Sequence, residues 1–162
     1  MDSLNDQVEV YTRLLAEGNI QKAYKGIVTF MSALRALFAQ RFEDCAVGAL
    51  YQGYMDMTYF ACTPPTLKTH QLKIAVVYLH EDNALEVWLA GANRSVQADF
   101  IRRVSGLEIS DLTLHKVAPG EDAIVSRLIA QRPDFDRPEA LTAAVEDSVR
   151  KFIARVETLL AL

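Results

Sequence analysis

The chain has 162 residues, of which 51% are hydrophobic and 23% are charged, and this composition is typical of a folded domain rather than of a disordered segment. Its net charge of −4 argues against a general nucleic-acid-binding protein, because proteins that grip phosphate backbones are usually basic. No apolar run approaches the roughly 20 residues of a membrane-spanning helix, and the acidic N-terminus does not resemble a signal peptide. We therefore expect a single domain over residues 1–162, without a membrane partner and with nucleic acid an unlikely one.

The two cysteines, Cys45 and Cys62, indicate the compartment. Sixteen residues separate them and no CxxC pair is present, so their spacing fits neither a disulfide framework nor a zinc site. Free cysteines are typical of a reducing compartment. The sequence therefore predicts a cytoplasmic protein.

Two helices are predicted at the N-terminal end of the chain. Residues 5–17 carry apolar side chains at helical spacing, and Gly18 ends this segment. From Ile20 to about Gln40, apolar residues recur at intervals of three and four, which is typical of a long helix with one apolar face. The short junction between them predicts a helical hairpin. No second copy follows, so a helical repeat array is not expected.

The middle of the chain changes to the alternating pattern of β-strands. Segments 47–61, 72–80 and 85–90 are rich in aromatic and β-branched residues. The sequence EDNA at 81–84 is typical of a hairpin turn between the second and third strands. We expect these segments to form an antiparallel sheet.

The last third of the chain is predicted to be mostly helical. A helix follows Gly91 and ends near Gly106, and 112–117 is a plausible fourth strand. Segment 119–131 is predicted as a short helix, and a long helix begins at Pro138. The fold class is therefore α+β, with an N-terminal helical hairpin, a central antiparallel sheet of three to four strands, and C-terminal helices packed on the sheet.

Three strings in the middle of the chain, YQGYMDMTYF, LKIAVVYLHE and LEVWLAGANRSVQ, resemble a family of small, uncharacterised bacterial cytoplasmic proteins with GYMDMTYF-like and EVWLAG-like strands. The similarity extends over most of the chain. This resemblance implies a single-domain bacterial protein. It implies no activity, substrate or catalytic residue, because the family has none established.

Alternation along the strands predicts which side chains share a face of the sheet. In the hairpin we expect Glu81 to pair with Ala84 and Leu79 with Glu86. One face then forms the core, with these residues: Leu72, Ile74, Val76, Tyr78, Leu85, Val87 and Leu89. In the first strand the methionine side is expected to join the core, which places Asp56 on the other face.

The second face therefore gathers the candidate site, with these residues: Tyr54, Asp56, Lys73, Glu86 and Trp88. Aromatic walls and orienting acids are the usual lining of a small-molecule cleft, so the favoured function is that of a binding or accessory protein. The alternative is a metal-dependent phosphodiesterase or nuclease that uses Asp56, Glu86 and Lys73, because carboxylates and a lysine suit divalent-metal phosphoryl chemistry. The third interpretation, which is favoured over the other two for Asp56 itself, is that this acid pairs with Lys73 or a tyrosine hydroxyl beneath a covering helix.

Two weaker features complete the predictions. Asn93 and Arg94 follow Gly91 at a strand end and a helix start, where backbone N–H groups favour anions, but the favoured explanation is a glycine turn with an asparagine cap. The three histidines lie in separate segments, so no metal site or cofactor is predicted. A homodimer is a further expectation, from the high apolar fraction and the frequency of symmetric dimers.

Overall fold

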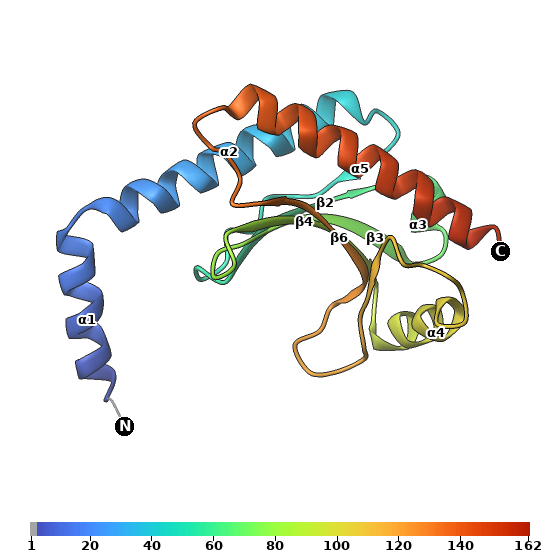
Figure 1. Cartoon of the computed structure of the whole chain (residues 1–162), viewed down its shortest axis with the longest axis horizontal. Coiled ribbons are helices and arrows are strands. Elements are labelled where there is room, and N and C mark those ends of the chain that lie inside the picture. The colour runs from blue at the N-terminus through green and yellow to red at the C-terminus, as the bar shows by residue number, and fades with distance from the viewer. Residues whose placement is uncertain (1–2) are drawn as a thin grey trace.

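Residues 3–162 are described in a computed structural model, in which a twisted sheet is covered by helices on both faces (Figure 1). The elements in chain order are α1 (Leu4–Ala16), α2 (Asn19–Arg41), β1 (Ala46–Val47), β2 (Met57–Thr63), α3 (Pro65–Lys68), β3 (Leu72–Leu79), β4 (Ala84–Gly91), α4 (Arg94–Val104), β5 (Thr113–Leu114), β6 (Ala123–Gln131) and α5 (Pro138–Leu160). None of the helices in this part of the chain combines the length and the apolar character needed to cross a membrane.

The sheet has six strands in the order β1-β2-β3-β4-β6-β5, and every neighbouring pair is antiparallel. The predicted α+β class, with two N-terminal helices and a C-terminal helix, is confirmed. The sheet has more strands than the three or four that the sequence predicts. The additional strands are β1 and β6, and β6 inserts between β4 and β5.

The first face of the sheet carries the hydrophobic core. In Figure 1, α2 and α5 lie together across this face. α2 buries Met31, Leu34 and Phe38 against it, and the apolar stripe of α5 is buried in the same way. The predicted core positions of the β3–β4 hairpin are all buried here, at no more than 3% exposure. Removal of this apolar surface from water is the main stabilising contribution to the fold.

The second face of the sheet is covered only in part. α4 contacts β4 and β6 on this face, and the segment that follows α4 loops beneath the sheet (Figure 1). Asn93 caps α4, since its side-chain oxygen accepts a hydrogen bond from the Val96 N–H at 2.9 Å.

The prediction of a short helix over 119–131 is wrong. Residues Ala123–Gln131 form β6, which pairs along most of its length with β4. Its apolar run can satisfy either a helix or a buried strand, so periodicity alone does not choose between them. Pairing with β4 makes this segment a strand, because the backbone N–H and C=O groups along the edge of β4 need hydrogen-bond partners.

The predicted hairpin register differs from the structure by two residues. Leu79 pairs with Ala84 and Val77 pairs with Glu86, so the turn spans four residues instead of two. Asn83 takes a positive φ of 48° in this turn. Because the shift is an even number of residues, the faces predicted for β3 and β4 stay correct.

The predicted faces of the first strand are reversed. Thr58, Phe60 and Cys62 point into the core and are fully buried, whereas Met57 and Tyr59 lie on the second face. Phe60 packs edge-on against Phe38 of α2, with ring centroids 5.5 Å apart. Both sides of this strand carry large apolar residues, so alternation could not determine which side α2 covers.

Burial of Thr58 is possible because its hydroxyl is fully bonded. It donates to the Gln52 carbonyl at 2.7 Å and lies 2.8 Å from His80 Nε2, which therefore carries a hydrogen and donates to it. Burial lowers the pKa of His80, although the charge of nearby Asp56 opposes this shift.

An acidic anchor fastens the segment between α4 and β6. Asp111 accepts hydrogen bonds from Arg155 of α5 at 2.9 and 3.1 Å and from Arg127 of β6 at 3.2 Å. These bonds, chiefly those from Arg155, lower the pKa of Asp111 below its usual 3.8. The anchor ties this segment to β6 and to α5, the helix that covers the first face of the sheet.

We predict that Asp111→Asn lowers the free energy of unfolding by up to about 1 kcal/mol near neutral pH, since the pair is partly exposed. A carboxylate whose pKa is lowered by folding stabilises the folded state above its unfolded pKa, here 3.8, and loses this effect as pH falls through the folded value. The difference between variant and wild type in urea unfolding should therefore shrink in acid. Asp147→Asn, which removes an exposed pair with Lys151, is the control. An equal difference at all pH values would contradict the assignment.

Candidate functional site

A cavity of about 290 Å³ opens on the second face of the sheet, beside the first turn of α4. Its floor is made of small side chains on β3 and β4, namely Ala75 and Ala90. Its walls come from β2, from α4 and from the segment that leads into β6. This volume lies at the small end of the range for ligand pockets.

Gly91 brings α4 close to the sheet at the cavity rim. A Cβ atom at this position would lie 2.8 Å from the Gln97 backbone nitrogen and 3.2 Å from the Asn93 carbonyl oxygen. Only glycine fits without displacement of the helix. The close approach places the first turn of α4, with Arg94 and Gln97, against the cavity.

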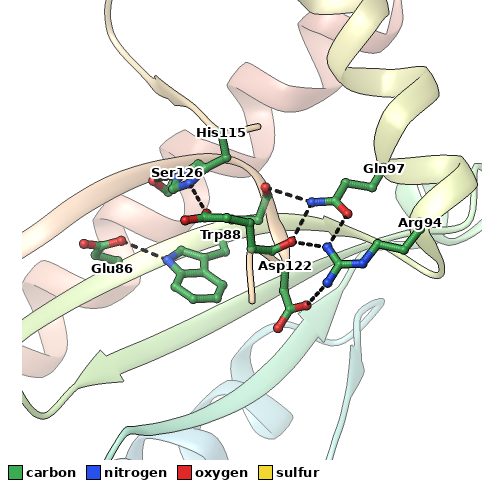
Figure 2. Close-up of polar contacts among 9 residues, drawn as sticks. Glu86, Trp88, Arg94, Gln97, His115, Asp122 and Ser126 are labelled. Atoms are coloured by element: carbon green, nitrogen blue, oxygen red, sulfur yellow. Dashed lines mark hydrogen bonds and ion pairs between the residues drawn. The ribbon is translucent and has the colours of Figure 1, made fainter. Parts of the chain in front are cut away.

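The wall on the β4 side is aromatic. Trp88 lines the cavity, and its ring N–H donates a hydrogen bond to Glu86 at 2.9 Å (Figure 2). Tyr59 lines the cavity from β2, and its ring lies against Tyr51 with centroids 5.0 Å apart. These contacts hold two flat side chains over a floor of small residues.

The rim of the cavity is cationic. Lys73 is exposed on β3, and its amino group forms no ion pair or hydrogen bond with any residue from 3 to 162. Arg94 lines the other side, where Asp122 is its ion-pair partner at 3.7 Å. Two positive groups thus face one negative group, although the whole chain has a net charge of −4.

Arg94 also has a structural role that its predicted anion site did not include. It donates to Gln97 Oε1 at 2.9 Å and to the carbonyl oxygen of Glu121 (Figure 2). Gln97, which is 2% exposed, in turn donates to the Glu121 carbonyl at 2.9 Å. This network ties α4 to the start of β6. Asn93 is occupied as the helix cap, so its side-chain oxygen serves α4 itself.

Of the five residues predicted for the cleft, Lys73 and Trp88 line the cavity, whereas Tyr54, Asp56 and Glu86 do not. Tyr54 is 91% exposed. Asp56 precedes β2, and its carboxylate accepts a hydrogen bond from the Tyr54 N–H at 2.9 Å. Backbone N–H groups of Tyr54 and Met57 lower the pKa of Asp56. Asp56 therefore stabilises a tight loop, and the prediction that it shares a sheet face with Lys73 is wrong.

The trio required by the nuclease alternative is not assembled. Asp56 lies beside the end of β3 near Leu79, and Lys73 is six residues away along that strand, roughly 20 Å at strand spacing. Glu86 lies opposite Val77 of β3, in the middle of the β3–β4 pair, and its carboxylate accepts a hydrogen bond from the Trp88 ring. Across residues 3–162, no three His, Cys, Asp or Glu side chains come close enough to hold a metal ion. Nothing in this arrangement supports a nuclease.

A hydrogen-bonded chain of three residues lies next to the cavity and was missed by sequence reasoning. Ser126 Oγ is 2.7 Å from His115 Nε2, and His115 Nδ1 is 3.0 Å from Glu121 Oε2 (Figure 2). A serine, a histidine and an acid in this order also form the catalytic triad of serine hydrolases. However, Ser126 is only 4% exposed and does not line the cavity. The chain therefore fastens the segment after β5 to the sheet.

The position of these residues explains why the sequence did not reveal them. His115 follows β5 and Ser126 lies on β6, and the two strands are neighbours. The pairing becomes visible only once 123–131 is assigned as a strand. Ser126 also lies opposite Trp88 on β4, so the chain and the aromatic wall share one face.

Comparison with known proteins places the chain by sequence. Residues 4–160 match DUF7000, a domain of unknown function. The chain belongs to the DUF7000 family. No curated protein and no solved structure matches it. Membership of DUF7000 is consistent with the resemblance to an uncharacterised family, and it brings no activity to the site.

We predict that Ser126→Ala lowers the free energy of unfolding by about 1–2 kcal/mol, because it leaves His115 without its buried partner. Chemical denaturation measures this change. Ser32→Ala, at an exposed position on α2, is the matched control and should change the stability by less than about 0.5 kcal/mol. Covalent labelling of Ser126 by a fluorophosphonate would contradict the structural role, since a buried hydroxyl that only fastens a loop should not react.

Proposed function

We propose that this DUF7000 protein binds a small anionic molecule with a flat, apolar body in the cavity beside α4. The observation that carries the proposal is the unpaired amino group of Lys73, which shares the cavity with Arg94 and with the ring of Trp88. A cation without a partner at the rim of an apolar pocket favours a carboxylate or a phosphate. Small floor residues leave room for a ring.

The charge expected of this ligand is opposite to the charge that would suit the acidic cleft predicted from the sequence. The predicted cleft is acidic and aromatic, whereas the cavity has the aromatic wall but lacks Asp56 and Glu86. Lys73 and Arg94 outweigh Asp122. An anionic group at the rim would therefore be attracted, and a cationic ligand would not be preferred.

A location in the cytoplasm and a single domain over residues 1–162 belong to the same proposal. Cys45 and Cys62 are both free thiols, which supports a reducing compartment. One sheet built from strands between residues 46 and 131, with α2 from before the strands and α5 from after them packed together on it, supports a single domain. A bacterial origin rests on the resemblance of the strand motifs alone.

The test uses phenyl phosphate and benzoate as anionic probes and benzyl alcohol as a neutral probe. Trp88 is the only tryptophan of the chain, so its fluorescence reports occupancy of the cavity directly. We predict that an anionic probe changes this fluorescence and raises the melting temperature, whereas benzyl alcohol does so much more weakly.

Lys73→Met should weaken binding of the anion about tenfold, the effect of losing one charged contact of about 1.4 kcal/mol. Lys68→Met, at an exposed lysine in α3, is the matched control and should bind as the wild type does. Equal binding of anionic and neutral probes, or an anion affinity that Lys73→Met leaves unchanged, would refute the proposal.

A further inference from the structure

The carboxylate of Asp122 has room for a further partner. Its ion pair with Arg94 measures 3.7 Å, which is longer than a hydrogen bond, and its side chain is 64% exposed (Figure 2). The hydrogen bonds of Arg94 go instead to Gln97 and to the Glu121 carbonyl. The oxygens of Asp122 can therefore accept a hydrogen bond from a ligand in the cavity that this residue lines.

The three charged groups of the cavity lie at one end of the strands. Lys73 lies opposite Ala90 of β4. Ala90 lies opposite Ala123 of β6, which follows Asp122 directly. Two strand spacings, about 10 Å, separate Lys73 from Ala123, and the long lysine side chain can cross much of this gap. Arg94 begins α4 just beyond the end of β4. A ligand at this end therefore meets two cations and one carboxylate.

The aromatic groups lie further along the same face. Trp88 is two residues from Ala90 on β4, about 7 Å at strand spacing. Tyr59 lies on β2, opposite Val77 of β3. β3 runs between β2 and β4, and its Ala75 lies opposite Trp88. A ring that enters between Trp88 and Tyr59 can therefore rest on the small side chain of Ala75. The cavity thus has a charged end and an aromatic end.

We propose that the ligand of this cavity is an aromatic α-amino acid. Its carboxylate contacts Lys73 and Arg94, and its ammonium group donates to Asp122. Its ring lies between Trp88 and Tyr59. A cavity of about 290 Å³ suits a molecule of this size, since larger pockets accompany drug-sized ligands. The inference rests on the proposed function, because the carboxylate is the anionic group that the cationic rim attracts.

Asp122 is the residue that selects an amino acid over a simple carboxylic acid. A ligand with a carboxylate alone meets Asp122 as a like charge beside Arg94, which costs affinity. An ammonium group on the neighbouring carbon turns this repulsion into a charged hydrogen bond. The two charges of the amino acid then lie against the Arg94–Asp122 pair with opposite signs facing each other.

The first test compares phenylalanine with three analogues by isothermal titration calorimetry of the full chain at neutral pH. The analogue 3-phenylpropionate lacks only the ammonium group, 2-phenylethylamine lacks only the carboxylate, and leucine lacks the aromatic ring. We predict that phenylalanine binds about tenfold more tightly than 3-phenylpropionate, the effect of one charged contact. The amine should bind most weakly, because Lys73 and Arg94 repel it. Leucine should bind about threefold to tenfold more weakly than phenylalanine, since it cannot stack on Trp88 and Tyr59.

The second test is Asp122→Asn, which should act in opposite directions on two ligands. Phenylalanine should bind about tenfold more weakly, because its ammonium group loses a charged partner. Binding of 3-phenylpropionate should stay the same or improve, because a like charge is removed. A loss of folding cannot produce this pattern, since it would weaken both ligands. Asp82→Asn, at an exposed aspartate in the turn between β3 and β4 and outside the cavity, is the matched control and should bind both ligands as the wild type does.

The outcomes separate this inference from the proposed function. If 3-phenylpropionate binds as tightly as phenylalanine, or if Asp122→Asn keeps the preference of the wild type, the amino-acid assignment is overturned while an anion site remains. Equal binding of leucine and phenylalanine overturns the aromatic assignment. Failure of phenylalanine and of every anionic probe to bind overturns both this inference and the proposed function.

Discussion

The fold depends on one constraint, which is that the first face of the β2–β3–β4–β6 sheet must be buried beneath α2 and α5. Leu34 and Phe38 of α2 and Phe152 of α5 are almost completely removed from water against this face. Because these two long helices occupy one side, the other side is left to α4 and to the loops around it (Figure 1). The cavity beside α4 exists because this second cover is incomplete, and its floor includes Ala75 and Ala90.

Polar networks hold the incomplete cover in place. Arg94 and Gln97 tie α4 to the start of β6, and the chain of Ser126, His115 and Glu121 fastens the segment after β5. No buried side-chain nitrogen or oxygen between residues 3 and 162 lacks a hydrogen-bond partner. Such satisfied networks specify geometry more than they add stability. Lys73 differs from these residues in that it lines the cavity without a partner among residues 3–162, which leaves it available to a ligand.

The cavity and the hydrophobic core lie on opposite faces of the sheet. An anionic ligand would enter the second face, whereas α2 and α5 pack on the first. Lys73 is exposed, so its substitution tests binding without removing a buried side chain from the core.

The sequence by itself determined the elements with strong periodicity and clear end signals: α2 after Gly18, the β3–β4 hairpin with its core face, α4 after Asn93, and α5 from Pro138. It failed where a segment is apolar on both sides. For β2 and β6 only tertiary packing decides the face or the type of element, since Phe60 fits beneath Phe38 and β4 needs a partner for its free edge. The candidate site followed from those decisions. Lys73 and Trp88 were placed on the face that carries the cavity because β3 and β4 were assigned correctly. Asp56 was misplaced together with β2, and the pairing of His115 with Ser126 could not be predicted without β6.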